Sequence, residues 1–288
     1  MRASTELRSR LAAGRTLWSA SAYDALSAKI IGDSGFDLVQ TAGFAISASA
    51  LGVPDVELYS VTENLNVVRA CVEAAGIPLI ADIDTGYGNA INVMRTVREF
   101  EKAGVAGVAL EDQVSPKRCP GLTDVEILPF DEAVGKVRAA VAARRDPDLL
   151  IVARTDTQDD DEAIRRGRAF VEAGADMFQV IAKYRNGFAA MERIRREVGV
   201  PLKVHVTGKV TEWSRDQIEG IAGVAGFAHV ALLSATAALR ANLAALAKTK
   251  SALDLPIQPM DRSAFHDFIG YPEVHKLQEQ FMPQRSAS

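Results

Sequence analysis

The sequence predicts an α/β fold, an eight-stranded parallel (β/α)8 barrel of the TIM type with a C-terminal helical tail. The first observation is a recurring sequence pattern, in which an amphipathic segment ends at a glycine and a short apolar run follows. It occurs at Gly76, Gly104, Gly174 and Gly199. Glycine suits the left-handed residue that ends a helix, and an apolar run without polar alternation is typical of a parallel strand buried on both faces. The second observation is the length of 288 residues, because such barrels use about 250 residues as one domain.

Eight strands follow when the chain is laid out on this pattern, with the last helix near residues 235–248. We expect the strands at residues 17–20, 37–41, 78–83, 106–111, 149–154, 176–181, 201–206 and 227–232. Between them apolar residues recur with the helical period, as in Val93, Val97 and Phe100. Short right-handed connections between parallel strands close eight such units into a barrel. A doubly wound open sheet is the alternative.

The barrel is expected to occupy residues 1–250, and a C-terminal helical extension residues 251–288. Within the extension, segment 272–281 begins with proline and places Leu277 and Phe281 on one side, which is typical of a helix. So short a helix is marginal alone in water. We therefore expect it to pack on the barrel or on a neighbouring subunit.

Composition and charge exclude several classes of protein. The chain has 33 basic and 37 acidic side chains and no basic run with interleaved aromatics, so nucleic-acid binding is not expected. The opening segment MRASTELRSRLAAGR lacks the apolar core of a signal peptide, and no stretch of about 18 apolar residues is free of charge. We expect a cytoplasmic protein with no membrane segment. Two cysteines, Cys71 and Cys119, are too few for a disulfide framework or a thiolate metal cluster.

Polar side chains gather at the carboxyl ends of the predicted strands. Asp82 and Asp84 end the third strand, and His205 lies late in the seventh. The fourth and fifth strands end at Glu111, Asp112, Arg154 and Asp156. Because the carboxyl ends of barrel strands converge on one mouth, where active sites are built, we expect these groups to share one small volume.

Clustered acids would repel one another unless a cation neutralised them. Asp82 and Asp84 are two residues apart and are expected to project to the same side of their strand. Carboxylate oxygens with retained waters suit Mg²⁺ or Mn²⁺. The sequence therefore predicts a divalent-cation site, and the alternative is that these acids cap the helices that follow.

The loop at residues 115–122 carries a candidate reactive thiol. Lys117 and Arg118 directly precede Cys119, and neighbouring positive charge lowers the pKa of a thiol. Cys119 is therefore a candidate for proton transfer or nucleophilic attack, whereas Cys71, in an apolar helix stripe, is interpreted as an inert core residue. Alternatively the loop covers the site, binds substrate charge through Lys117 and Arg118, or is a degenerate remnant.

Several motifs together resemble the isocitrate lyase and phosphoenolpyruvate mutase superfamily. They are SAYDALSAKI near the first strand, SASALGVPD at 47–55, ADIDTGYGNA at 81–90, EDQVSPKRC at 111–119 and ARTD at 153–156. The likeness extends over roughly residues 1–175 with matching order and spacing. It implies the same barrel, a last helix exchanged between subunits, and a homo-oligomer, either a tetramer or a dimer.

The resemblance also implies roles for individual residues. It assigns direct Mg²⁺ coordination to Asp82, and metal-bound waters to Asp55, Asp84 and Glu111. Arg154 is implied to bind the substrate carboxylate. His205 is a candidate to line the mouth beside the substrate because of its own place at a strand end, not because of the resemblance. The backbone of Ala42, Gly43 and Phe44 is implied to receive the substrate oxygens. Cys119 is implied to be the acid-base cysteine of a gating loop that also carries Lys117 and Arg118.

The sequence departs from the lyase pattern at three places. Lyases acting on 2-methylisocitrate or dimethylmalate read K-R-C-G-H, whereas Pro120 and Gly121 follow the cysteine here. Ile181 stands where those lyases carry a glutamate, and His205 stands at their usual asparagine position. The phosphonopyruvate and oxaloacetate branches also lack the glutamate, but they lack the K-R-C loop as well.

Three functions are consistent with these residues. The leading hypothesis is a Mg²⁺-dependent lyase that cleaves a carbon–carbon bond of a small 2-hydroxy or 2-oxo dicarboxylate through an enolate. The cation and Arg154 would stabilise the charge that develops on its oxygens. The second hypothesis is a mutase or hydrolase acting on phosphonopyruvate or a carboxyphosphonate analogue. The third, motivated by the missing Gly-His pair, is a non-catalytic metabolite-binding barrel.

Overall fold

The computed structural model describes residues 1–119, 124–181 and 187–282. Eight parallel strands close into a barrel, because β1 pairs with both β2 and β8. The strands are β1 (Leu17–Ala22), β2 (Leu38–Thr41), β3 (Leu79–Asp82), β4 (Gly107–Glu111), β5 (Leu150–Thr155), β6 (Met177–Val180), β7 (Leu202–His205) and β8 (Ala222–Phe227). The predicted barrel is confirmed, and the open doubly wound sheet is excluded.

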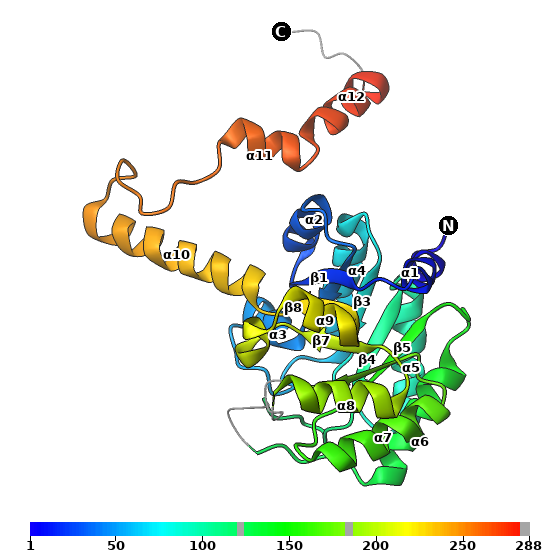
Figure 1. The fold of residues 1–288 in the computed structure, drawn as a ribbon. Coiled ribbons are helices and arrows are strands. Elements are labelled where there is room, and N and C mark those ends of the chain that lie inside the picture. The colour runs from blue at the N-terminus through cyan, green and yellow to red at the C-terminus, as the bar shows by residue number, and fades with distance from the viewer. Residues whose placement is uncertain (120–123, 182–186, 283–288) are drawn as a thin grey trace. The chain divides into compact units, whose positions relative to one another are not determined.

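Helices connect the strands and lie outside the ring that the strands form (Figure 1). Those of the barrel are α1 (Ala3–Ala12), α2 (Ala25–Asp33), α3 (Gly43–Leu51), α4 (Val61–Ala75), α5 (Ala90–Lys102), α6 (Phe130–Ala143), α7 (Asp160–Glu172), α8 (Phe188–Val198) and α9 (Arg215–Ile221), with the 3-10 helix η2 (Gly208–Glu212). Local sequence explains their ends. Ser60 and Glu63 form a capping box at the start of α4, and Gly76 ends that helix with φ 65.

Apolar side chains fill the lower interior of the barrel. Inward-facing residues of several strands pack together there, among them Leu17, Leu38, Ile80, Val152 and Val224, and Leu7 of α1 joins them. This layer lies toward the amino ends of the strands. The interior is therefore a packed core that supports a polar layer at the carboxyl ends, as is usual for this fold.

The eighth strand differs from its prediction. It runs from Ala222 to Phe227, whereas residues 227–232 were expected. A Cβ at Gly226 would lie 2.0 Å from the Gln40 side chain, and one at Gly223 would lie 2.7 Å from Pro201. The strand requires glycine for these close approaches, whereas a sequence rule reads glycine as a break. His229, which falls within the predicted strand 227–232, instead precedes α10, and its ring centroid lies 5.0 Å from that of Phe44.

The chain divides into two compact units, Met1–Leu233 and Ser234–Ser288. Helix α10 (Val230–Thr249) crosses this division, and α11 (Arg262–Phe268) and α12 (Tyr271–Phe281) belong to the second unit. Helix α12 has proline in its first turn, and it confirms the helix predicted at 272–281.

Helix α10 is apolar as well as long. Among its 20 residues, a stretch of 18 has a mean hydropathy of 1.6, and by length and composition alone the helix could cross a membrane. Two cations, Arg240 and Lys248, lie within it. None of the residues of α10, α11 or α12 is buried.

Candidate active site

Four strands bring their side chains into one row across the mouth of the barrel. Glu111 of β4 is paired in register with Arg154 of β5, which is paired with Gln179 of β6, and Gln179 is paired with Lys203 of β7. These four residues line a small cavity together with Asp82, Ala109 and His205. The Arg154 guanidinium lies 2.8 Å from Glu111. The structure therefore brings Asp82, Glu111, Arg154 and His205 together, as the sequence predicts.

A second acidic group adjoins this cavity. Lys117 Nζ lies 3.0 Å from Asp55 and 2.5 Å from Asp84, and all three side chains are buried. The hydroxyl groups of Tyr59 and Tyr87 donate hydrogen bonds to Asp84. The two groups are connected, because the Asp84 backbone N–H donates to Asp82 Oδ1 at 3.1 Å.

Gly43 lies against both groups. Its backbone N–H donates to Asp82 Oδ2 at 3.0 Å. A Cβ at this position would stand only 2.7 Å from Asp84 Oδ1 and from the Tyr59 hydroxyl. Only glycine lets the first turn of α3 approach so closely. Of the predicted oxygen-binding segment, Gly43 therefore borders the acids, Ala42 is the N-cap of α3, and Phe44 contacts His229.

Burial and neighbouring charges set the ionisation of this region. Burial raises the pKa of Asp84 to about 6 although Lys117 opposes the change, and it raises the pKa of Glu111 well above its usual value against the effect of Arg154. Burial alone would lower the pKa of Lys117, but Asp84, Glu111 and Asp55 raise it well above its ordinary value. Lys117 is therefore a permanent cation that partly neutralises the acids.

The acids of the mouth offer oxygen donors that the protein does not fully use. Glu111 Oε1 is buried and accepts no hydrogen bond from the described residues. Across the same residues, no three acidic, histidine or cysteine side chains converge into a ready-made metal cluster. The cavity that Asp82 and Glu111 share measures about 10 Å³, which is roughly the room that one water or one ion needs.

The loop with the predicted thiol is held to the mouth by its backbone. The Lys117 N–H donates to Glu57 at 2.9 Å, and the Arg118 N–H donates to Gln113 Oε1 at 2.9 Å. Lys117 turns inward to the acids, whereas Arg118 is exposed and Cys119 is half-buried. The departures at Pro120 and Gly121 lie outside the described residues.

Asp112 does not join the mouth, contrary to prediction. Successive side chains of a strand point to opposite faces, so Glu111 faces inward and Asp112 faces the helices. There Asp112 pairs with Arg166 of α7 at 2.9 Å and accepts a hydrogen bond from Thr155. Asp156, by contrast, forms an ion pair with Arg154 at 2.8 Å and so helps to orient its guanidinium in the mouth.

Sequence reasoning missed several residues of the site. Tyr59 and Glu57 lie on a loop whose pattern carries no chemical signal, and Tyr87 lies within the motif at 81–90, for which the resemblance assigns no role to the tyrosine. Lys203 does carry a signal, because it is a charged residue within a buried strand, LKVH. A charged residue inside a buried strand is costly unless its surroundings use it.

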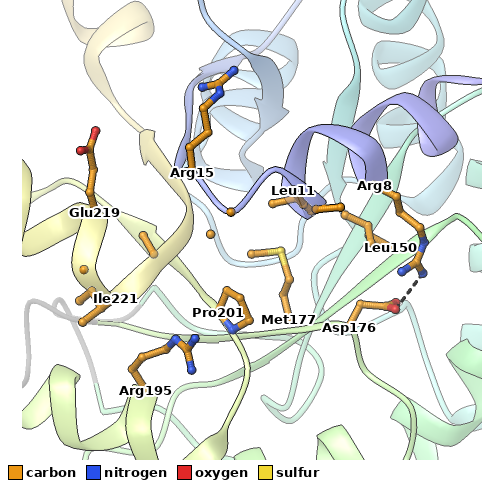
Figure 2. A pocket seen from close by; sticks show the side chains of 15 residues that line it. Arg8, Leu11, Arg15, Leu150, Asp176, Met177, Arg195, Pro201, Glu219 and Ile221 are labelled. Carbon is orange, nitrogen blue, oxygen red and sulfur yellow. Dashed lines mark hydrogen bonds and ion pairs between the residues drawn. The ribbon is translucent and has the colours of Figure 1, made fainter.

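A larger cavity, of about 570 Å³, opens at the other end of the barrel (Figure 2). Leu150, Met177 and Ala222, each the first residue of its strand, line it with Arg8 of α1. Arg8 pairs there with Asp176 at 2.8 Å. None of the predicted site residues lies in it, and conserved chemistry of these barrels belongs to the carboxyl ends of the strands.

Comparison with known proteins identifies the family of the chain and supports its fold. The family model described as phosphoenolpyruvate phosphomutase matches residues 7–253. The chain is 39% identical to 2,3-dimethylmalate lyase of Eubacterium barkeri, over 99% of this chain and 100% of that protein. It superposes with a TM-score of 0.91, at 31% identity, on phosphoenolpyruvate phosphomutase from Streptomyces platensis subsp. rosaceus, over 97% of this chain and 99% of that one. Phosphonopyruvate hydrolase in complex with oxalate and Mg²⁺ superposes with a TM-score of 0.87, at 28% identity, over 98% and 100% of the two chains.

Proposed function

Because the chain belongs to the phosphoenolpyruvate phosphomutase family, we propose that it is a metal-dependent lyase that cleaves a carbon–carbon bond of a small 2-hydroxy or 2-oxo dicarboxylate. The observation that carries the proposal is the cavity that the row across β4 to β7 shares with Asp82 of β3, in which Arg154 lies 2.8 Å from Glu111. Arginine can bind the carboxylate of such a substrate, and the neighbouring acids can bind its other oxygens through a cation.

The donor set of the mouth fits a hard divalent cation, Mg²⁺ or Mn²⁺. Asp82 would hold the ion directly, and Asp55, Asp84 and Glu111 would hold its waters. The unused buried oxygen of Glu111 supports this assignment, because a buried carboxylate oxygen without a donor is unfavourable unless a ligand supplies one. When bound, the ion would act as a Lewis acid toward the substrate oxygens.

The protein's own residues bind and orient the substrate. Arg154 is held by Glu111 and Asp156, each at 2.8 Å, so its guanidinium is positioned before the substrate arrives. A substrate carboxylate would take a bidentate hydrogen bond from it. Lys117 and Arg154 keep positive charge beside the oxygens on which negative charge develops when the bond breaks.

Cys119 supplies the proton that ends the reaction. The carbon that receives the electron pair of the broken bond becomes an enolate carbon, and a thiol on a loop at the mouth can protonate it. The hydrogen bonds that Lys117 and Arg118, the two residues before Cys119, donate to Glu57 and Gln113 support this role, because they hold the start of the loop.

Purified protein tests the proposal when it is assayed with 2-methylisocitrate, 2,3-dimethylmalate, malate analogues and oxaloacetate, with and without Mg²⁺. We expect cleavage that EDTA abolishes and that Mg²⁺ restores. Cys119→Ala should abolish cleavage but still permit decarboxylation of oxaloacetate, whereas Cys71→Ala, in the core of α4, should keep the activity of the folded enzyme. Turnover that persists without metal would contradict the proposal.

Chemistry at phosphorus is the second candidate. Ile181, directly after β6, stands where the lyases that this chain resembles carry a glutamate, and phosphonopyruvate hydrolase superposes on nearly the whole chain. Phosphorus NMR on phosphonopyruvate and carboxyphosphonate analogues separates the two candidates. A new phosphorus signal would favour this chemistry, and an unchanged spectrum would exclude it for these compounds.

We further propose that the protein acts in the cytoplasm as a homo-oligomer, a tetramer or a dimer, with its last helix exchanged between subunits. Helix α10 and helix α12 support this, because their exposed apolar side chains include Leu239, Leu243, Leu277 and Phe281. Such faces are usually covered by protein. The C-terminal extension, residues 251–288, would then serve assembly rather than chemistry.

A further inference from the structure

Lys203 is a buried amine inside the mouth that the proposed mechanism has not used. Its side chain is 3% exposed. Its Nζ lies 2.9 Å from Gln179 Oε1 and 3.1 Å from His205 Nε2. No carboxylate of the described residues forms an ion pair with it.

The geometry leaves one direction of this amine for a ligand. A lysine nitrogen is tetrahedral, with three positions beyond its own carbon. Gln179 Oε1 and His205 Nε2 can each accept one hydrogen, which accounts for two positions. The third is left for the cavity that Lys203 lines with Asp82, Glu111 and Arg154. It carries a proton when the amine is charged and a lone pair when it is neutral.

The surroundings favour the neutral form. Burial lowers the pKa of Lys203 to about 7, Asp82 opposes this, and Arg154 lowers the pKa further. The ionisable groups that share its cavity are Asp82 from β3, Glu111 from β4, Arg154 from β5 and His205 from its own strand, while β6 contributes the neutral Gln179. Desolvation beside a second cation is a known way to keep a lysine reactive near neutral pH.

We propose that Lys203 is the catalytic base that takes the hydroxyl proton of a 2-hydroxy dicarboxylate when its carbon–carbon bond breaks. This inference rests on the proposed lyase function and narrows its substrate to a hydroxy acid. The hydroxyl proton moves to the amine, the oxygen forms a carbonyl, and the electron pair of the broken bond passes to the carbon beside the carboxylate. That carbon then takes the thiol proton of Cys119. An ammonium and a thiolate remain, and one proton passes between them through solvent.

The other groups of the mouth fit this role less well. Arg154 is always charged, and the pKa of Lys117 lies well above its usual value, so neither can accept a proton near neutral pH. Asp82 accepts from the backbone N–H groups of Gly43 and Asp84. Burial lowers the pKa of His205 well below its usual value, so its imidazole is a weak base.

Two substitutions separate a base from a positive charge that only binds substrate. Lys203→Met removes both properties, and Lys203→Arg keeps the charge but cannot accept a proton. We expect both variants to lose about 10²- to 10⁴-fold in kcat with little change in KM, while Lys209→Met, at an exposed lysine, keeps wild-type kcat. The fall of wild-type kcat/KM below pH of about 7 should disappear in both variants. A Lys203→Arg enzyme within tenfold of wild-type kcat would overturn the inference.

A measurement without turnover tests the same group. In protein with ¹³Cε-labelled lysine, one NMR signal should titrate near neutral pH and be missing from Lys203→Met. If that signal titrates only above a pH of about 9, the amine is charged during turnover and the inference fails. If the signal titrates near neutral pH but wild-type protein cleaves no dicarboxylate, the proposed lyase function fails instead.

Discussion

Gly43 shows how much the mouth depends on a single missing methyl group. Gly43→Ala would place a Cβ 2.7 Å from Asp84 and from the Tyr59 hydroxyl, so α3 or the acids must move. A misplacement of about 1 Å in an active site can cost about 10²-fold in rate. We expect Gly43→Ala to lose about that much in kcat/KM and to bind Mg²⁺ more weakly, as measured by steady-state kinetics and calorimetry.

Gly135 provides the matched control. It lies within α6, and a Cβ there would meet nothing within 4 Å. Gly135→Ala should therefore keep wild-type activity and gain about 0.5–1 kcal/mol of stability, because glycine costs a helix that much relative to alanine. Unchanged activity in Gly43→Ala would show that the acids do not need their present positions.

Lys203 should also make stability depend on pH. Its folded pKa of about 7 lies below the value near 10.4 of an unfolded lysine, so the unfolded chain binds more protons between these values. The stability of the wild type should therefore rise relative to Lys203→Met as pH increases from about 7 to about 10, by at most about 5 kcal/mol. Urea unfolding of both proteins at several pH values measures this difference, and a difference independent of pH would contradict the prediction.

Individual side chains differ in how well the sequence predicts them. Asp82, Glu111 and Arg154 follow from their places at strand ends, because the barrel topology alone makes those ends converge. The burial of Lys117 does not follow, because it depends on Asp55 and Asp84, which are distant along the chain. Neighbouring cations in a sequence indicate an exposed loop, and here one of the two turns inward.

At the scale of the elements, the ion pair of Asp112 and Arg166 ties α7 to the end of β4. Both side chains are nearly fully buried, and Arg166 also donates to the Leu128 carbonyl. Arg166→Ala would leave the Asp112 carboxylate buried without its cation, which typically costs about 3–5 kcal/mol. We expect a loss of that size in the free energy of unfolding, measured with urea.

Arg168, two residues further along the same helix, is the control. It forms an ion pair with Glu197, and its own side chain is more than half exposed. Arg168→Ala should therefore cost at most about 1 kcal/mol, because solvent screens such pairs. Equal losses in the two variants would mean that burial does not determine the strength of these pairs.

The misplaced eighth strand shows a limit of pattern reading for elements. The other seven strands are marked by apolar runs after a helix, and their predicted and observed ranges overlap. In β8, Gly223 and Gly226 are required by contacts with Pro201 and Gln40, which belong to distant parts of the chain. A local pattern cannot reveal such contacts, so the sequence pattern predicts a strand at 227–232 instead.

At the scale of the whole molecule, the apolar faces of the second unit predict association. We expect sedimentation or light scattering to show a dimer or tetramer at micromolar concentration. Leu277→Asp should weaken association, because an exposed leucine of α12 would become a charged residue in an interface. Glu279→Lys, a charge change at an already charged position of that helix, should leave the assembly intact. A monomeric wild-type protein would contradict the prediction.

The alternation of side chains in β4 gives two adjacent residues two separate duties. Glu111 lines the cavity in the mouth, and Asp112 forms an ion pair with Arg166 of the surrounding helix α7. Deletion of one residue earlier in β4 would turn Glu111 toward the helices and Asp112 toward the mouth. A shift of β4 by one residue could restore them, but it would break the pairing with β3 and β5, because the ring of strands is closed. Single-residue deletions in β4 should therefore be selected against far more strongly than point substitutions, since one event would damage catalysis and folding together.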